Sequence, residues 1–155
     1  MRIRDARADD WPNVSDLLAE LGRPDVRRDD DEPRHGEAFA RYLERPDTVA
    51  LVAEDDGKLV GFVDLEVRQR LNFLSPQGWV PDLVVSERVR GQGVGRALLE
   101  AAEDRAREHG CWGMSLESAA WRIESHAFYE RVGCSQTGRS FTRPLADVQW
   151  PPAPR

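Results

Sequence analysis

The residues with the most specific chemical meaning form a glycine-rich hexapeptide, Arg90-Gly91-Gln92-Gly93-Val94-Gly95. An apolar strand candidate precedes this loop, and an amphipathic helical pattern follows it. At such a junction, free backbone N–H groups and the positive end of the helix dipole bind phosphate, and glycines permit close approach. The pattern therefore predicts a diphosphorylated ligand.

Two well-known phosphate-binding motifs do not match this loop. The loop of nucleoside triphosphatases requires Lys followed by Ser or Thr, but Arg96 and Ala97 follow the last glycine. The dinucleotide-binding fingerprint needs Gly or Ala at position 96 and follows the first strand, whereas this loop follows the fourth. A glycine-rich turn that only packs a helix on a sheet is the remaining alternative.

Two segments together resemble the GCN5-related N-acetyltransferases, the GNAT family. Residues 90–95 look like the R/Q-x-x-G-x-G/A signature of that family, and residues 126–133, HAFYERVG, are similar to its final helix. The resemblance covers most of the chain and is weakest over residues 20–47. It implies transfer of an acetyl group from acetyl-CoA, as co-substrate, to an amine. The backbone amides of residues 90–96, ending at Arg96, would hold the pyrophosphate.

The resemblance also implies a mixed α/β fold with a central, mostly antiparallel sheet and flanking helices. In this family the fourth and fifth strands splay apart, so backbone groups of the fourth can bond the pantetheine. Here those groups belong to Leu83, Val84 and Val85. Pro81 lies in the same strand candidate and cannot donate a ladder hydrogen bond, so the strand must be an edge, carry a bulge or part from its neighbour.

Attack of an amine on a thioester needs a neutral amine, a donor for the developing oxyanion and a proton for the leaving thiolate. Tyr129 matches the tyrosine that protonates the thiolate in the family, although it could instead be a packing aromatic beside Phe128. A backbone N–H near Leu83 to Val85 is the expected oxyanion donor.

The general base and one binding residue depart from the family pattern. Asp82 is the expected base, directly or through water, but the family often carries Glu one place earlier, at Pro81. Glu117 and a water relay without a dominant base are the alternatives. Arg122 stands where many relatives place Asn, and it either reaches a CoA phosphate or is a solvated arginine of the first helical turn.

The hydrophobic pattern predicts the elements that must position these groups. Strands are expected at 2–4, 48–53, 59–67, 79–85 and 111–117, with strand-like pieces at 135–137 and 140–142. Helices are expected over 11–21, from 39 to about 45, from 94 to about 109, and over 125–132, and a loop over 23–36. Residues 1–147 are expected to form one GNAT domain, followed by a tail over 148–155.

The resemblance places acceptor choice in residues 17–45 and 68–78, which carry no motif. The run Asp29-Asp30-Asp31-Glu32 either attracts a cationic amine or is a solvated loop. The expected activity is acetylation of a primary amine of a small molecule, by direct attack in a ternary complex. The alternatives are acetylation of protein amines, a CoA-binding sensor module without turnover, and a structural domain without a ligand.

Composition limits the partners and the compartment. The chain has 155 residues, with 28 acidic and 22 basic side chains, a formal net charge of −6 and a sequence pI of about 5.1. This balance argues against a nucleic-acid partner. Without an export signal or membrane span, the expected location is the cytoplasm. Two isolated cysteines support neither a disulfide framework nor a metal site. The candidate oligomeric state is a homodimer with Trp150 at its interface.

Overall fold

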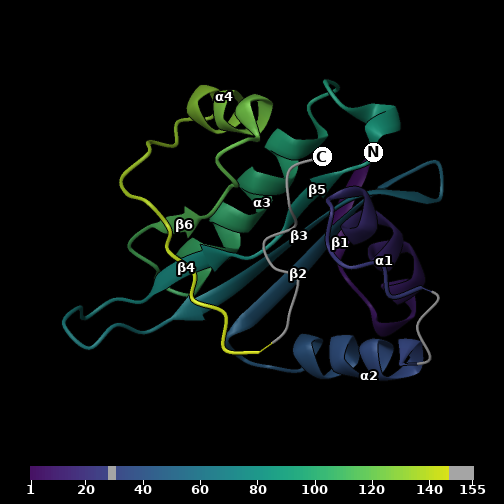
Figure 1. Cartoon of the computed structure of the whole chain (residues 1–155), viewed down its shortest axis with the longest axis horizontal. Helices are drawn as coiled ribbons and strands as arrows, with labels where there is room; N and C mark the ends of the chain where they lie inside the picture. The colour runs from purple at the N-terminus through teal and green to yellow at the C-terminus, as the bar shows by residue number, and fades with distance from the viewer. Residues whose placement is uncertain (28–30, 147–155) are drawn as a thin grey trace. The chain divides into compact units, whose positions relative to one another are not determined.

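One six-stranded sheet organises the larger part of the computed structural model, which describes residues 1–27 and 31–146. The chain divides into two compact units, Met1–Leu116 and Glu117–Arg155. All six strands lie in the first unit (Figure 1). Their order is β1-β2-β3-β4-β6, with β5 paired to β3. The strands are β1 Arg2–Asp5, β2 Thr48–Asp55, β3 Lys58–Arg68, β4 Gln77–Val80, β5 Leu83–Val85 and β6 Met114–Leu116.

The hairpin of β2 and β3 is the centre of this sheet and is confirmed as predicted. Asp56 and Gly57 form its turn with φ values of 46° and 73°. Two central residues with positive φ match the right-handed twist of the flanking strands, which is why Asp-Gly favours such turns. The hairpin thereby sets which residues of β3 face each side of the sheet.

The predicted fourth strand is divided into β4 and β5 by a bulge at Pro81 and Asp82. Glu66 pairs with Trp79 and Val63 pairs with Leu83. The distance is three residues along β3 but four along the opposite strand, which therefore contains one extra residue. The extra residue lies where Pro81 cannot donate a ladder bond. β4 continues the sheet by pairing in parallel with β6, whereas β5 pairs with β3. The predicted fourth and fifth strands, 79–85 and 111–117, therefore pair only where β4 meets β6, and the expected parting of the two beyond Val80 and Leu116 is confirmed.

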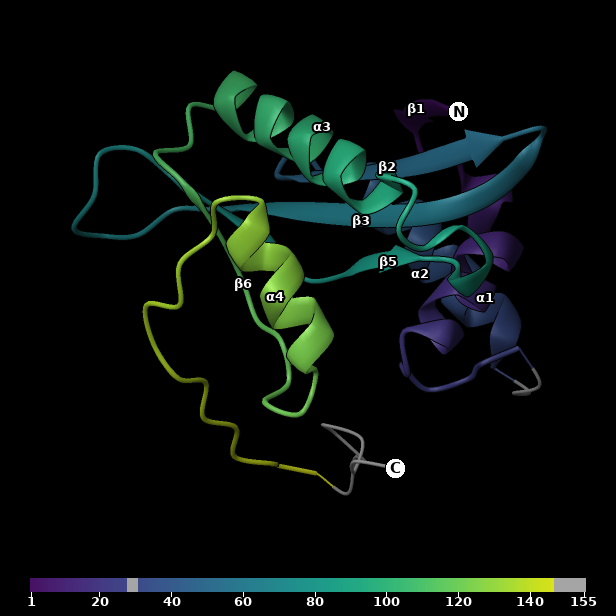
Figure 2. The same ribbon diagram turned by 90° about the horizontal axis from the view of Figure 1, so that it is seen from above.

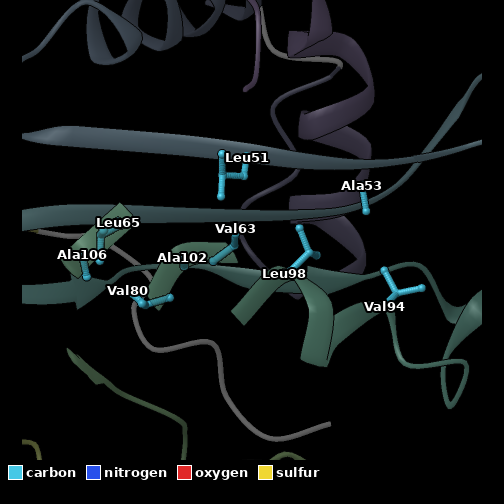
Figure 3. Packing of buried hydrophobic residues seen from close by; sticks show 9 residues of the cluster. All are labelled: Leu51, Ala53, Val63, Leu65, Val80, Val94, Leu98, Ala102 and Ala106. Atoms are coloured by element: carbon cyan, nitrogen blue, oxygen red, sulfur yellow. The ribbon is translucent and has the colours of Figure 1, made fainter. Parts of the chain in front are cut away.

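Helices cover both faces of the sheet in the first unit (Figures 1 and 2). On one face, α1 (Trp11–Glu20) and α2 (Glu32–Leu43) pack on the sheet through a core that includes Val14, Phe39 and Phe62. On the other face, α3 (Val94–Glu108) packs through the cluster drawn in Figure 3. Its buried members are Leu51, Ala53, Val63, Leu65, Val80, Val94, Leu98, Ala102 and Ala106.

A glycine in β3 permits the close packing of α3. A Cβ added at Gly61 would lie 2.7 Å from Leu98 Cδ1 and 3.2 Å from Val94 Cγ1. Both side chains belong to the first turns of α3, so this glycine sets how near the glycine-rich loop lies to the sheet. Short 3-10 turns at Ala8–Asp10 and Glu87–Val89 precede α1 and the loop.

Two local predictions are wrong. α2 begins at Glu32, inside the region expected to be a loop, because Asp31, Glu32 and Pro33 supply the acidic and proline signals of a helix start. In the second unit, α4 (Ile123–Arg131) is present, but residues 135–137 and 140–142 form no strand. Short polar segments form strands only where a partner offers its edge, and these have no paired strand in the described chain. Asp29, Asp30, Trp150 and the tail over 148–155 lie outside the described residues.

Candidate active site

The glycine-rich loop has the backbone geometry of an anion-binding turn. Gly91 and Gly93 have φ values of 78° and 85°, and Gly93 is the N-cap of α3. A Cβ at either position would meet no atom within 4 Å, so conformation and not space demands glycine. The first helical bond runs from Ala97 N–H to Gly93 O, 3.0 Å.

The amides that follow Gly93 are those best placed to bind an anion. Val94, Gly95 and Arg96 occupy the first turn of α3, whose N–H groups have no carbonyl one turn earlier in the helix. The Gln92 N–H, by contrast, donates to Val89 O at 3.3 Å. The prediction of a diphosphate ligand therefore depends on the N-terminal amides of α3 more than on Gln92.

The outer edge of β5 leads into this loop. The Ser86 N–H donates to Val60 O and the Asp64 N–H to Asp82 O, at 2.9 and 3.1 Å. Antiparallel alternation then directs the backbone groups of Val84 toward β3 and those of Leu83 and Val85 away from it. Arg90 lies at the same edge, where its Nε donates to Val85 O at 3.4 Å.

A pocket of about 250 Å³ lies on the opposite face of the sheet from α3, between α1, α2, β3 and the bulge. Its walls include the aromatic side chains Trp11, His35, Phe39, Tyr42 and Phe62, and its polar groups include the carboxylates of Asp64 and Asp82. Aromatic rings and carboxylates in one small cavity are complementary to an organic cation.

Asp64 is a buried carboxyl that was not identified from the sequence. It lies in β3 opposite Ala50 and is 8% exposed. The Tyr42 hydroxyl donates to its Oδ2 at 3.1 Å, and the Asp82 N–H donates to its Oδ1 at 2.8 Å. The signal that could have revealed it is a carboxylate directly after the apolar run LVGFV, inside a strand where a buried, unpaired charge is rare.

Burial raises the pKa of Asp64 to about 7, and the nearby Asp82 carboxylate adds to the increase. The hydrogen bonds from Asp82 N–H and Tyr42 oppose this rise because they stabilise the charged form. Burial and Asp64 together raise the pKa of Tyr42, so its hydroxyl remains a donor. The pocket thus holds a carboxyl that can gain and lose a proton near neutral pH.

Asp82, the base expected from the sequence, lies in the bulge beside this pocket. Its Oδ1 accepts from Arg23 Nε at 2.5 Å, and the same guanidinium donates from Nη2 to Pro81 O at 3.0 Å. One carboxylate oxygen of Asp82 is therefore engaged by a cation. The bulge turns Asp82 toward the pocket while its own N–H bonds to Asp64.

Tyr129, Arg122 and Glu117 belong to the second unit. The Tyr129 ring meets Phe128 edge-on, with ring centroids 5.3 Å apart, and the Arg122 guanidinium lies 4.8 Å from the centre of the Trp121 ring. Arg122 is the N-cap of α4, and Glu117 is exposed. Their roles remain predictions.

Within residues 1–27 and 31–146, no cluster of three metal-ligating side chains occurs. Neither Cys111 nor Cys134 forms a disulfide within the described residues. No helix in those ranges is long and apolar enough to span a bilayer.

The chain is similar to known acetyltransferases in sequence and fold. The model of the acetyltransferase (GNAT) family matches residues 3–134. An aminoalkylphosphonate N-acetyltransferase of Salmonella typhimurium is 31% identical, over 92% of this chain and 90% of the relative. An aminoglycoside N(6')-acetyltransferase type 1 of Stenotrophomonas maltophilia is 32% identical, over 83% and 75%.

A solved structure agrees with these relatives. A putative acetyltransferase from Agrobacterium tumefaciens superposes with a TM-score of 0.82 and 26% identity, covering 93% of this chain and 99% of that one. The bulge at Pro81 and Asp82, the free outer edge of β5 and the glycine-rich loop thus occur in a chain whose sequence and fold both resemble acetyltransferases. The protein therefore belongs to the GNAT family and is an N-acetyltransferase.

Proposed function

We propose that the protein transfers the acetyl group of acetyl-CoA to a primary amine of a small molecule, by direct attack in a ternary complex. The observation that carries this proposal is the continuity of the outer edge of β5 with the glycine-rich loop, beside a pocket that contains two carboxylates. The names of the two relatives, an aminoalkylphosphonate and an aminoglycoside acetyltransferase, support a small-molecule acceptor.

The residues that would hold acetyl-CoA follow from the backbone. The outward N–H and C=O groups of Leu83 and Val85 would bond the pantetheine as an added strand would. The amides of Val94, Gly95 and Arg96 would bind the pyrophosphate, with Gly91 and Gly93 giving the turn its shape. Arg90 and Arg122 are the side chains proposed for the phosphates.

Three groups of this chain would perform the chemistry. Acetyl-CoA, when bound, supplies the thioester carbonyl that the amine attacks. An outward N–H of Leu83 or Val85 would stabilise the oxyanion, and Tyr129 would give its hydroxyl proton to the leaving thiolate. The sequence leaves three candidates for the general base: Asp82, Glu117 and a water relay.

The test combines acetyl-CoA binding with thiol release for the wild type and Tyr129→Phe. Phe keeps the ring that packs on Phe128 and removes the hydroxyl alone. We expect equal calorimetric affinity for acetyl-CoA and a loss of about 10²-fold or more in amine-dependent thiol release. Equal release by both proteins would reject the acid role of Tyr129.

The same experiment separates the alternatives. Binding without release on any small amine, but with release on peptides bearing free amines, would favour protein acetylation. Binding with no release on either would favour a sensor module. No binding of acetyl-CoA would reject the proposal. We further propose one catalytic domain over residues 1–147, a cytoplasmic location and no nucleic-acid or membrane partner.

A further inference from the structure

The buried carboxyl of Asp64 is not used by the chemistry proposed so far. It occupies a core position, since Phe62 and Asp64 alternate onto the same face of β3 as the cluster beneath α1 and α2. Burying a carboxyl there destabilises the fold, and a group with a strongly perturbed pKa inside a pocket is a candidate for function.

The hydrogen bonds of Asp64 distinguish it from Asp82. Among the described residues, the hydrogen-bond donors to Asp64 are neutral: the Tyr42 hydroxyl donates to Oδ2 and the Asp82 N–H donates to Oδ1. Asp82 is instead ion-paired with the Arg23 guanidinium. A carboxylate without a cation at either oxygen is the better partner for an incoming ammonium group, because no existing ion pair must be broken.

We propose that the aromatic pocket binds the acceptor as a compact primary ammonium with an apolar body, and that Asp64 accepts its proton. This inference rests on the proposed function and adds to it a base and a substrate class. The rings of Trp11, Phe39 and Phe62 would contact the apolar body. A volume of about 250 Å³ lies just below the roughly 300–1,000 Å³ of pockets for drug-sized ligands, which favours a small amine.

The proton and electron transfers balance. Asp64 takes one proton from R–NH₃⁺, and the lone pair of the neutral nitrogen then attacks the thioester carbonyl carbon. A C–N bond forms as the C–S bond breaks, and the second proton lost from nitrogen matches the proton gained by the departing sulfur. Asp64 returns its proton to solvent, so each amide formed releases one proton.

The groups around Asp64 set the pH dependence. Tyr42 faces it from α2, Asp82 from the bulge and Glu66 from β3, while Arg23 pairs with Asp82 and Arg45 lies over the Tyr42 ring. His35 lines the same pocket. With a pKa of about 7, Asp64 gains and releases a proton near neutral pH, as a general base in this pocket needs to do.

The main experiment uses Asp64→Asn with 2-phenylethylamine as the acceptor probe. Asn retains the shape and can accept from Asp82 N–H while its NH₂ donates to the Tyr42 hydroxyl. We expect kcat/KM near neutral pH to fall about 10²-fold while the Kd for acetyl-CoA stays the same. Asp16→Asn, the same chemical change at an exposed residue of α1 that does not line the pocket, is the matched control and should retain activity.

An acceptor with weak basicity tests the role itself. 2,2,2-Trifluoroethylamine is largely neutral at neutral pH and needs no base for its first proton, so Asp64→Asn should lose much less rate with it. An equal loss on both amines would overturn the proton-acceptor role. Faster turnover of 2-aminoethylphosphonate than of 2-phenylethylamine by the wild type would overturn the proposed substrate class.

A readout without turnover separates this inference from the proposed function. In the free protein, the ¹³C signal of the Asp64 carboxyl should titrate near pH 7, and 2-phenylethylammonium should lower that midpoint. A midpoint unmoved by the amine overturns the inference even if acetyl transfer is confirmed. If the midpoint moves but no amine is acetylated, the binding pocket stands and the proposed function fails.

A second variant covers the case in which Asp64→Asn does not fold. Tyr42→Phe removes a hydrogen bond that lowers the pKa of Asp64, so that pKa should rise. The acidic limb of the kcat/KM profile should move to higher pH together with the ¹³C midpoint. An unchanged limb in a folded Tyr42→Phe protein would overturn the role of Asp64.

Discussion

At the scale of single residues, the burial of Asp64 opposes folding, whereas the chemistry proposed for the pocket requires this carboxyl. Phe62, two residues earlier on the same face of β3, is apolar and buried, and Asp64 beside it is 8% exposed. The Tyr42 hydroxyl and the Asp82 N–H satisfy its oxygens but leave the charge itself poorly solvated. Function can retain such a group at the expense of stability.

This conflict predicts a pH-dependent stability. The pKa of Asp64 rises from 3.8 to about 7 on folding, so the folded state binds more protons between those values. The stabilising contribution of Asp64 is full below about pH 4 and is lost as the pH rises through about 7. Asp64→Asn should remove this slope and be more stable than the wild type near pH 8 by on the order of 1–2 kcal/mol.

Urea denaturation at several pH values measures this effect. The exposed Asp16→Asn variant is the control and should keep the slope of the wild type, because Asp16 is a surface partner of Arg27. The prediction is wrong if Asp64→Asn and the wild type lose stability in parallel between about pH 4 and pH 7.

At the scale of elements, α3 joins the glycine-rich turn proposed to bind phosphate to the hydrophobic core. Its N-cap is Gly93 in the left-handed region, and Gly110, with φ of 72°, lies just beyond its other end. Neither glycine would bring an added Cβ within 4 Å of another atom. The two glycines therefore differ chiefly in which pole of the helix dipole they adjoin.

Gly93→Asp should weaken acetyl-CoA binding by about tenfold or more, because a carboxylate at the N-terminus of α3 repels the pyrophosphate. Gly110→Asp imposes similar backbone strain and the same charge at the opposite end, so it should leave the affinity close to that of the wild type. Calorimetric titration of both variants gives the comparison. Equal affinities would reject the phosphate-binding role of the loop.

The contact between β3 and α3 gives a second prediction for an element. In Gly61→Ala the new Cβ would approach Leu98 Cδ1 to 2.7 Å, so α3 or the side chain must shift. We expect a loss of about 1–3 kcal/mol in the free energy of unfolding. Gly113→Ala meets no atom within 4 Å and is the matched control. Thermal unfolding of both variants measures the difference. Equal unfolding midpoints would contradict the tight contact between Gly61 and Leu98.

At the scale of the whole molecule, the proposed homodimer needs a surface. In the first unit, Leu71 and Leu74 are fully exposed between β3 and β4, and Phe73 stacks on Trp112 with ring centroids 5.6 Å apart. Apolar side chains gathered on one surface segment mark an interaction site more often than scattered ones do.

We therefore predict a concentration-dependent dimer that Leu74→Asp weakens. Sedimentation velocity over a range of concentrations measures it, and Phe141→Asp, at an exposed residue of the second unit, is the control. A wild type that sediments as a monomer at every concentration would reject the dimer.

Features that depend on neighbouring residues could be predicted from the sequence. The Asp-Gly turn is confirmed, and of the alternatives predicted at Pro81 the structure has a bulge where the strand parts. Backbone conformation at glycine and proline is decided within a few residues, so type and spacing suffice. The start of α2 was missed although Asp31, Glu32 and Pro33 carry local signals, because the surrounding charges resembled a solvated loop.

The family and the mixed α/β class could be predicted from the sequence, because their signals lie in contiguous segments. The same segments carry the proposal that the glycine-rich loop binds phosphate. The burial of the Asp64 carboxyl in a pocket, by contrast, depends on contacts between distant parts of the chain. Its partners Tyr42 and Asp82 stand 22 and 18 residues away in the chain. The raised pKa arises from burial and from a second carboxylate, and both depend on how β3, α2 and the bulge pack together.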